Sequence, residues 1–441
     1  MKRFTATKTA LIAGGMAALL SACAGDQKTT PTVGERMPIL SRIESGAVVD
    51  PALANISVVL PAPRTNAEWA QVGGSASKSY GHLALGESPV AQWTARVEGS
   101  SNRARLAAAP VIGGNKLFAV GSDGTIHAFD KKTGSRIWNS DAAMDDDMRP
   151  SAFGGGVSFD NGTLYATNGA GEVKAMNAET GEISWRVQPA GPLRGSPTIA
   201  FGQIYVMTQD NQVIALNAAD GETLWSESGS SAQSGVFGVA APAAGNGTVI
   251  AGYSSGELSA YRYENGRALW ADALARTNIS TQVSSLTDID ADPIIDAGRV
   301  YALGQGGRMA AYELVTGQRI WELSLAGIST PSIAGEWIFT LTDDARLLAI
   351  ARSTGRVRWI TQLQQFKNEK KREQPIFWTG PVLAGNHLWV ASSRGEIWRV
   401  STGEGSAQIF DDIDQPVSLP PVVADNMLYV LDDSGVIRAY Q

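Results

Sequence analysis

Short apolar segments recur along the chain at a regular spacing. Residues 213–216 and 347–350 are apolar at every position, and runs this short suit strands that are buried on both faces. Turn-forming pairs such as Asp123-Gly124 and Ser434-Gly435 separate such segments, since glycine readily adopts the backbone angles of tight reversals. The pattern therefore predicts an all-β fold of many short strands.

A second pattern fixes the length of the repeating unit. A glycine stands four residues before a tryptophan in each of these pairs: Gly134/Trp138, Gly181/Trp185, Gly221/Trp225, Gly266/Trp270, Gly317/Trp321 and Gly355/Trp359. Successive tryptophans, counted from Trp93, are about 44 residues apart, which is enough for four short strands and their turns. Four strands per repeat, repeated radially, predict the blades of a β-propeller.

The repeats also predict how the ring closes. Seven repeats begin near residues 110, 152, 197, 242, 293, 331 and 381, and Phe410 takes the tryptophan position of the seventh. An eighth repeat begins at Pro421 and stops at Gln441 before its last strand, whereas the strand around Trp93 has no repeat before it. We therefore predict an eight-bladed β-propeller of four-stranded antiparallel blades over residues 69–441. Its N-terminal strand completes the last blade and removes an exposed edge.

The recurring tryptophans are interpreted as packing residues between neighbouring blades. A sugar-stacking or cofactor site is the alternative, but the same spacing in nearly every repeat is typical of a structural residue. Each indole between two blades would bury a large apolar area. The set comprises Trp93, Trp138, Trp185, Trp225, Trp270, Trp321 and Trp359.

The N-terminal residues predict the cellular location. Three basic residues precede an apolar run over residues 10–20, which is too short to span a bilayer and fits a secretory signal. The run ends in Leu-Ser-Ala before Cys23, which resembles the bacterial lipobox. We predict a signal peptide over 1–22, lipidation of Cys23, a flexible tether over 23–68 and an anchor on the periplasmic face of the outer membrane. The alternative is an ordinary cleaved signal with an incidental cysteine.

Composition narrows the classes of function. The chain has 441 residues, a formal net charge of −7 and one cysteine. Nucleic acid is an unsuitable partner because it needs a basic face, and one cysteine excludes a disulfide framework. His82, His127 and His387 are scattered over distant repeats. We therefore predict no catalytic set, no metal site and no cofactor.

Two charged runs leave alternatives open. Residues 145–147, with nearby Asp141, are acidic, and either bind calcium or form a solvated loop between blades; they lack the spaced ligands of an EF-hand. Residues 361–376 contain a basic insertion with Glu369 and Glu373 interleaved. This insertion is interpreted as an exposed loop, with a contact to a partner as the alternative.

The repeat resembles the quinoprotein type. Residues 115–119 and 124–134 show its motif of a short apolar strand, a Gly-x-hydrophobic-x-Ala strand and a Thr-Gly turn. Two groups of proteins share it: dehydrogenases that depend on pyrroloquinoline quinone (PQQ), and the BamB family of lipoproteins from the outer-membrane β-barrel assembly machinery. The lipobox and the single propeller are similar to the BamB family. Many of the dehydrogenases have an adjacent cysteine pair, which this chain lacks.

Two segments between blades carry the most specific resemblance. Residues 191–197 resemble a Leu-Arg-Gly…Pro segment of the BamB family, and residues 286–293 resemble its Leu-Ser-Asp-Val-Asp-x-x-Pro segment. The resemblance implies that Leu193, Arg194, Asp288 and Asp290 contact BamA, the barrel-forming subunit. A second leucine of the family pattern is replaced here by Gly191, so we expect a smaller apolar contact.

The residue types of these segments suit a protein contact. Arg194 beside Leu193 would present a planar cation on an apolar shoulder, and Asp288 and Asp290 are expected to point outward to a basic partner. The alternative for Arg194 is a salt bridge to those aspartates across neighbouring blades.

The resemblance implies a non-enzymatic scaffold, monomeric within a hetero-complex, that binds the periplasmic domains of BamA. Unfolded outer-membrane proteins are further expected partners. A PQQ-dependent dehydrogenase of alcohols or sugars and a general periplasmic adaptor are the alternatives.

Overall fold

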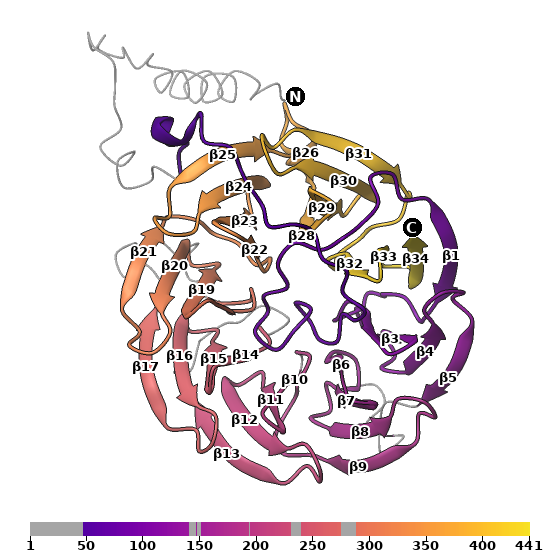
Figure 1. Cartoon of the computed structure of the whole chain (residues 1–441). Coiled ribbons are helices and arrows are strands. Elements are labelled where there is room, and N and C mark those ends of the chain that lie inside the picture. The colour runs from indigo at the N-terminus through magenta and orange to yellow at the C-terminus, as the bar shows by residue number, and fades with distance from the viewer. Residues whose placement is uncertain (1–46, 141–146, 148–150, 194, 231–239, 275–287) are drawn as a thin grey trace, which may run out of the picture. The chain divides into compact units, whose positions relative to one another are not determined.

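The computed structural model describes residues 47–140, 147, 151–193, 195–230, 240–274 and 288–441. Eight four-stranded antiparallel sheets stand radially around a central axis (Figure 1). The predicted all-β fold and the count of eight blades are confirmed. Among the described residues the longest helix is a single 3₁₀ turn, η2 (Pro51–Leu53), and no helix is long and apolar enough to cross a membrane.

The strands of each blade follow one another outward from the axis. Blade 1 contains β2 (Val111–Gly113), β3 (Lys116–Val120), β4 (Ile126–Asp130) and β5 (Arg136–Ser140). Blade 2 contains β6 (Val157–Asp160), β7 (Thr163–Thr167), β8 (Val173–Asn177) and β9 (Ile183–Val187). Blade 3 contains β10 (Thr198–Ala200), β11 (Gln203–Met207), β12 (Gln212–Asn217) and β13 (Thr223–Ser228). Blade 4 contains β14 (Ala243–Gly245), β15 (Thr248–Gly252), β16 (Glu257–Arg262) and β17 (Ala268–Ala273).

The second half of the ring repeats this order. Blade 5 contains β18 (Ile294–Asp296), β19 (Arg299–Gly304), β20 (Arg308–Glu313) and β21 (Arg319–Leu323). Blade 6 contains β22 (Ser332–Ala334), β23 (Trp337–Leu341), β24 (Arg346–Ala351) and β25 (Val357–Gln362). A hairpin of β26 (Phe366–Asn368) and β27 (Glu373–Pro375) precedes blade 7, which contains β28 (Trp378–Ala384), β29 (His387–Ser392), β30 (Glu396–Ser401) and β31 (Ala407–Asp412). Blade 8 contains β32 (Val422–Ala424), β33 (Met427–Leu431), β34 (Val436–Tyr440) and β1 (Ala91–Arg96).

Blade 8 joins the two ends of the propeller. Strand β1 pairs antiparallel with β34, from Arg96 opposite Val436 to Ala91 opposite Tyr440. Val90 and Gln441 extend the ladder, because each N–H donates to the other's carbonyl at 2.8 and 2.9 Å. The predicted closure by the N-terminal strand is confirmed.

Each recurring indole packs on the turn glycine of the following blade. A Cβ atom built on Gly266 would lie 2.8 Å from the ring of Trp225, and that glycine has a φ of +70°. Six of the indole N–H groups also donate to a backbone carbonyl of the next blade, at 2.8 to 3.2 Å. Packing and hydrogen bonding together explain why glycine and tryptophan recur at one spacing. The contacting pairs are Trp93/Gly134, Trp138/Gly181, Trp185/Gly221, Trp225/Gly266, Trp270/Gly317, Trp321/Gly355 and Trp359/Gly405.

Two glycines with the same backbone angle allow this packing to be tested. Gly298 has a φ of +74°, but a Cβ there would meet nothing within 4 Å. Both Gly266→Ala and Gly298→Ala should lose about 1–2 kcal/mol through the left-handed conformation. Only Gly266→Ala also displaces an indole, which should cost about 1–3 kcal/mol more. Urea unfolding of the two variants measures the difference, and equal losses would contradict the packing role.

The seventh blade departs from the tryptophan pattern for a structural reason. Its Phe410 packs against Tyr440 of blade 8, with the ring centroids 5.4 Å apart. Blade 8 has no covalent turn between β34 and β1, because β1 precedes blades 1 to 7 in the chain and β34 follows them. The junction of blades 7 and 8, here called the seam, therefore lacks the turn glycine on which an indole packs at the other junctions.

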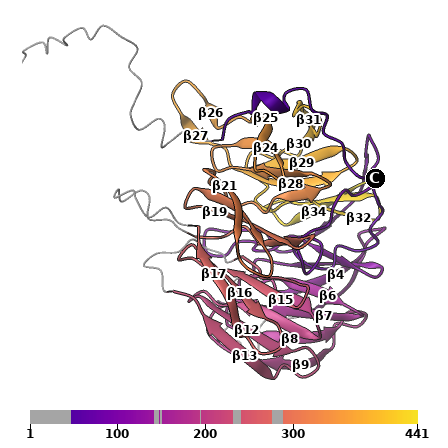
Figure 2. The same cartoon turned by 60° about the vertical axis from the view of Figure 1, so that its left-hand side comes forward.

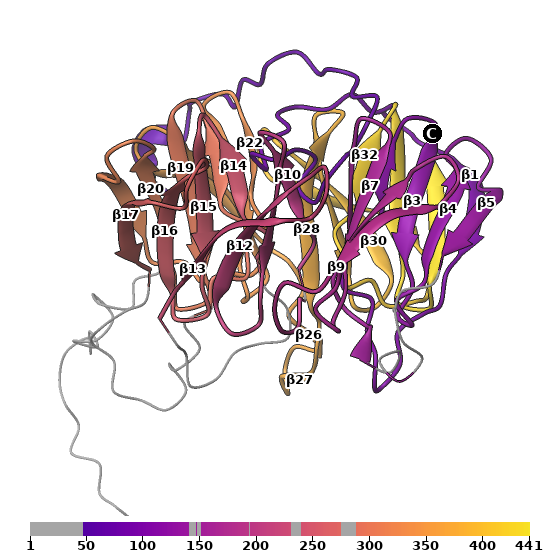
Figure 3. The same ribbon diagram turned by 90° about the horizontal axis from the view of Figure 1, so that it is seen from below.

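The N-terminal segment lies on one face of the ring. Residues 47–90, here called the strap, contact the turns between the first and second strands of several blades: Asp425 donates to Asn66, and Gly385 donates to Leu83. Figure 3 shows the strap over this face, the strap face. The opposite face, here called the connection face, holds the links between blades and the turns between their second and third strands.

The boundary expected for the tether is wrong. Residues 47–68 belong to the compact unit that starts at Gly46, and Val49 forms a parallel bridge with Val357 on the outer edge of β25. Arg358 of the same strand donates to the carbonyl of Ile56 at 2.7 Å. The predicted signal peptide, Cys23 and the remainder of the tether lie outside the described residues.

Candidate partner-binding face

Leu193 lies in the link between blades 2 and 3 on the connection face. Its backbone pairs with Thr208, and its side chain is 0% exposed, in a cluster with Val173, Ile204 and Val206. The expectation that Leu193 forms an exposed apolar shoulder is therefore wrong, because the side chain fills the space between two blades. Its neighbour Arg194 lies outside the described residues.

Asp288 and Asp290 lie in the link between blades 4 and 5. The carbonyl of Asp288 accepts from the N–H of Gln305 at 2.9 Å, and the N–H of Ile289 donates to Tyr253 at 3.2 Å. These bonds hold the link against the turns of both blades. Asp288 is only 1% exposed, so the expectation of an outward side chain is wrong for this residue. Asp290 is partly exposed.

The environment of Asp290 disfavours its charged form. Its Oδ2 atom is buried and accepts no hydrogen bond from the described residues. Burial, followed by the neighbouring charges of Asp288 and Asp343, raises the pKa of Asp290 to about 7. Burial, followed by the charge of Asp344, raises the pKa of Asp343 to about 6. A cation brought by a partner would relieve this repulsion.

Asp292 connects the same link to the interior. Its Oδ1 accepts from the N–H of Ala241 at 2.7 Å, and its own N–H donates to Thr330 at 3.0 Å. Three successive links between blades are thereby held together. The charge of Asp292 also favours the protonated form of the buried Lys78, whose pKa burial lowers to about 8.

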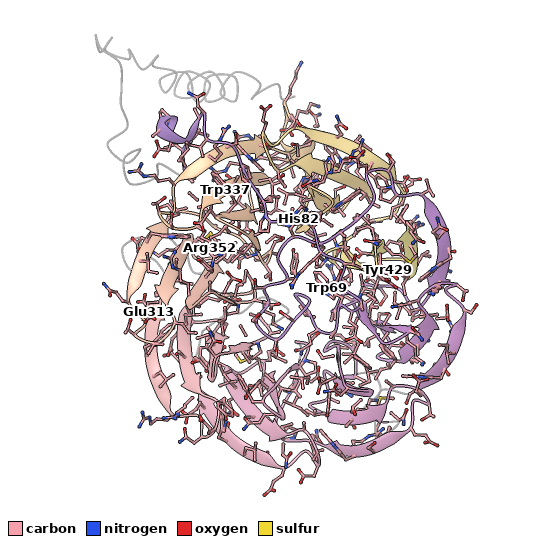
Figure 4. All side chains as sticks on the ribbon, in the orientation of Figure 1. Trp69, His82, Glu313, Trp337, Arg352 and Tyr429 are labelled. Atoms are coloured by element: carbon pink, nitrogen blue, oxygen red, sulfur yellow. The ribbon has the colours of Figure 1, made fainter. Side chains whose placement is uncertain are left out.

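The strap crosses the centre of the ring on the strap face (Figure 1). Trp69 pairs with Ile112 through two backbone hydrogen bonds of 2.9 Å, and its ring lies 4.8 Å from that of Tyr80. Lys78, 1% exposed, donates to Thr198 at 3.0 Å. Figure 4 shows Trp69 and His82 near the axis of the ring. The inner strands thus bind the chain's own segment where a propeller can hold a ligand.

Sequence reasoning missed several members of this arrangement. Asp343 lies on the turn after β23, and Lys78 lies in a stretch without periodicity. Asp292 follows the two candidate aspartates at the same spacing of two residues, which is the one signal that could have included it. In the part of the chain that the structure describes, no three His, Cys, Asp or Glu residues gather in a way that could hold a metal ion. The candidate calcium run at 145–147 lies outside the described residues apart from Asp147.

Comparison with known proteins identifies the family. The profile of the family described as "Outer membrane protein assembly factor BamB" matches residues 84–149 and 122–361. This chain belongs to the BamB family. The family protein of Yersinia pestis is 26% identical over 336 residues, which cover 75% of this chain and 83% of that protein. The one from Escherichia coli K12 is 25% identical over 332 residues, with 74% and 82% covered.

Solved structures agree with the propeller architecture of the BamB family. BamB from Moraxella catarrhalis superposes with a TM-score of 0.68 at 18% identity, covering 80% of this chain and 99% of that one. A quinohemoprotein alcohol dehydrogenase from Pseudomonas putida gives a TM-score of 0.66 at 12% identity, covering 85% and 80%. At these identities both likenesses concern the fold alone.

Proposed function

We propose that this chain is a non-enzymatic lipoprotein scaffold of the outer-membrane β-barrel assembly machinery, anchored through Cys23 on the periplasmic face of the outer membrane. The observation that carries the proposal is the family match over residues 84–361. The strap across the centre of the ring supports a scaffold rather than a PQQ-dependent dehydrogenase, since Tyr80 and Lys78 bond to inner strands there.

The connection face is the proposed contact for the periplasmic domains of BamA. Asp290 supplies a partly exposed carboxylate whose charge lacks compensation from the described residues. An arginine or lysine of the partner would gain both a charge pair and the relief of repulsion among the aspartates. Arg194 supplies a positive charge, opposite in sign to the carboxylate of Asp290. Leu193 acts by positioning Arg194, because its own side chain is buried.

The proposal predicts a loss of affinity without a loss of fold. Arg194→Ala and Asp290→Ala should each weaken binding to the purified periplasmic domains of BamA by about tenfold to a hundredfold, as expected for charged residues at the centre of an interface. Biolayer interferometry gives the affinity, and circular dichroism verifies the fold. Asp220→Ala is the matched control, because Asp220 is an exposed aspartate on the turn between β12 and β13, which lies on the strap face.

The outcomes separate the alternatives. Full affinity in both variants would contradict the assigned contact, and the absence of binding by the unaltered chain would contradict the function. Leu193→Ala is unsuitable as a test, because the cavity it leaves would cost about 2–5 kcal/mol of stability.

The outer edges of the blades are the proposed contact for unfolded outer-membrane proteins. An outer strand presents unpaired backbone groups to an incoming strand. The strap already uses one such edge, since the N–H of Asp50 donates to the carbonyl of Val357 on β25 at 2.8 Å. Ile137, Leu224 and Ile320, on the outer strands of blades 1, 3 and 5, are exposed aliphatic residues and would pack against alternate side chains of a client strand.

A further inference from the structure

The hairpin β26–β27 is a basic projection on the connection face. It stands away from the blades between β25 and β28 (Figures 2 and 3). Four cations lie on it, and all are exposed: Lys367, Lys370, Lys371 and Arg372. None of them forms an ion pair with a residue that the structure describes. Glu369 and Glu373 lie on the same hairpin, so its four cations and two carboxylates give a formal charge of +2 within a chain of net charge −7.

The foot of the hairpin is held by several hydrogen bonds. The indole N–H of Trp378 donates to the carbonyl of Gln364 at 2.8 Å, and Ile376 donates to Gln365 at 2.8 Å. Glu369 accepts from the backbone N–H of Gln365 at 2.9 Å, so this carboxylate closes the hairpin from within. These bonds fix the direction in which the projection leaves the ring, which lowers the entropy lost on binding.

An exposed aromatic residue accompanies the cations. Phe377 is 69% exposed, although its N–H donates to the hydroxyl of Ser393 at 3.0 Å and its carbonyl accepts from the Ser393 N–H at 2.8 Å. The backbone of Phe377 is thus fixed on both sides while its ring stays in solvent. Rigid exposed aromatic rings beside basic residues are typical of binding hot spots.

The arrangement favours a protein surface over a lipid surface. The tip of the hairpin is charged and polar, with Lys370 and Lys371 next to Glu369, whereas Phe377 lies at the foot beyond β27. A hairpin that inserts into a bilayer needs its apolar side chains at the tip, which reaches the membrane first. Here the apolar ring is reached only by a partner that lies along the hairpin.

We propose that β26–β27 and Phe377 form a second contact on the connection face, which binds an acidic surface of the same partner protein that Asp290 contacts. This inference rests on the proposed function. The partner would then carry a basic patch facing Asp290 and an acidic patch with an apolar side chain facing the hairpin. Two patches of opposite sign fix the orientation of the complex, because the reversed orientation would place like charges together.

Charge reversal at the tip tests the inference. The variant Lys370→Glu/Lys371→Glu should weaken binding to the purified periplasmic domains of BamA by at least about tenfold and should flatten the decrease of affinity with salt. Phe377→Ser should weaken binding by about five- to thirtyfold with little change in the salt dependence. The control is Lys132→Glu/Arg267→Glu, which changes the net charge equally at two exposed residues on turns of the strap face.

Each outcome decides the inference. Loss of affinity in the hairpin variants with full affinity in the control supports the second contact. Unchanged affinity in both hairpin variants overturns it and leaves the proposed function in place. A third outcome would favour a lipid surface: the unaltered chain binds vesicles of phosphatidylglycerol, and Lys370→Glu/Lys371→Glu abolishes that binding but keeps full affinity for BamA. This outcome overturns the inference. If the unaltered chain fails to bind BamA, the proposed function and this inference fail together.

Discussion

Trp225→Ala should lower the free energy of unfolding by about 3–5 kcal/mol, the cost of truncating a buried aromatic ring. The indole of Trp225 lies between Tyr205 and Tyr261, with centroid separations of 5.9 and 6.1 Å. It also donates to the carbonyl of Tyr263 in the next blade at 2.8 Å. Truncation therefore opens a cavity at the junction of two blades and leaves an unpaired carbonyl. Urea unfolding followed by tryptophan fluorescence and circular dichroism measures the loss.

Two further variants separate packing from hydrogen bonding at this junction. Trp225→Phe keeps most of the apolar ring and loses the N–H donor, so we expect a loss of about 1–2 kcal/mol. Leu224→Ala changes the neighbouring exposed residue and should alter stability by less than about 0.5 kcal/mol. A loss below 1 kcal/mol for Trp225→Ala would contradict the structural role and reopen the assignment of the tryptophans to a ligand site.

Asp290→Asn should stabilise the protein above pH 7 by up to about 4 kcal/mol, the equivalent of three pH units in pKa. The pKa of Asp290 in the folded chain is raised to about 7 from 3.8. Between pH 4 and pH 7 the folded state holds a proton that the unfolded state has released, so the stability of the unaltered chain falls as the pH rises. Asparagine resembles the protonated aspartate and does not ionise, so the fall in stability with rising pH that Asp290 causes is absent from Asp290→Asn.

The measurement is a comparison of urea unfolding at pH 4.5, 6 and 8. The difference in unfolding free energy between Asp290→Asn and the unaltered chain should be about 1 kcal/mol at pH 4.5, about 3 kcal/mol at pH 6 and about 4 kcal/mol at pH 8. Asp210→Asn, at an exposed position on the same face, is the control and should show no such trend. A constant difference at all three values would contradict the raised pKa.

The blade architecture was predictable because one local rule repeats. Each tryptophan packs on a glycine about 40 residues later, as Trp225 does on Gly266, and the spacing of such pairs is visible in the sequence. The position of Trp93 without a preceding repeat was sufficient to predict the closing strand. Even the exception, Phe410, falls at the seam where the covalent turn is missing.

The connection face was less predictable because its residues do not repeat. Leu193 and Asp288 occur in irregular segments, where no period distinguishes a buried side chain from an exposed one.

Two further segments could not be predicted from a pattern. On the strap face, residues 47–68 are held by hydrogen bonds to distant turns, such as Asp425 to Asn66, and composition carries no signal of such contacts. The insertion at 361–376 was interpreted as an exposed loop; the structure shows an exposed hairpin, whose strands of three residues are too short to give a pattern.

The closure of blade 8 sets the order in which the molecule can be completed. Ala91 and Tyr440 pair across about 350 residues, and contacts of such sequence separation form late because a long loop must close first. Strand β1 precedes blades 1 to 7 in the chain, yet its ladder partner β34 follows all of them. Until β1 and β34 pair, the ring therefore has an unpaired sheet edge on both strands, and loss of β34 would leave seven finished blades without a sealed circle.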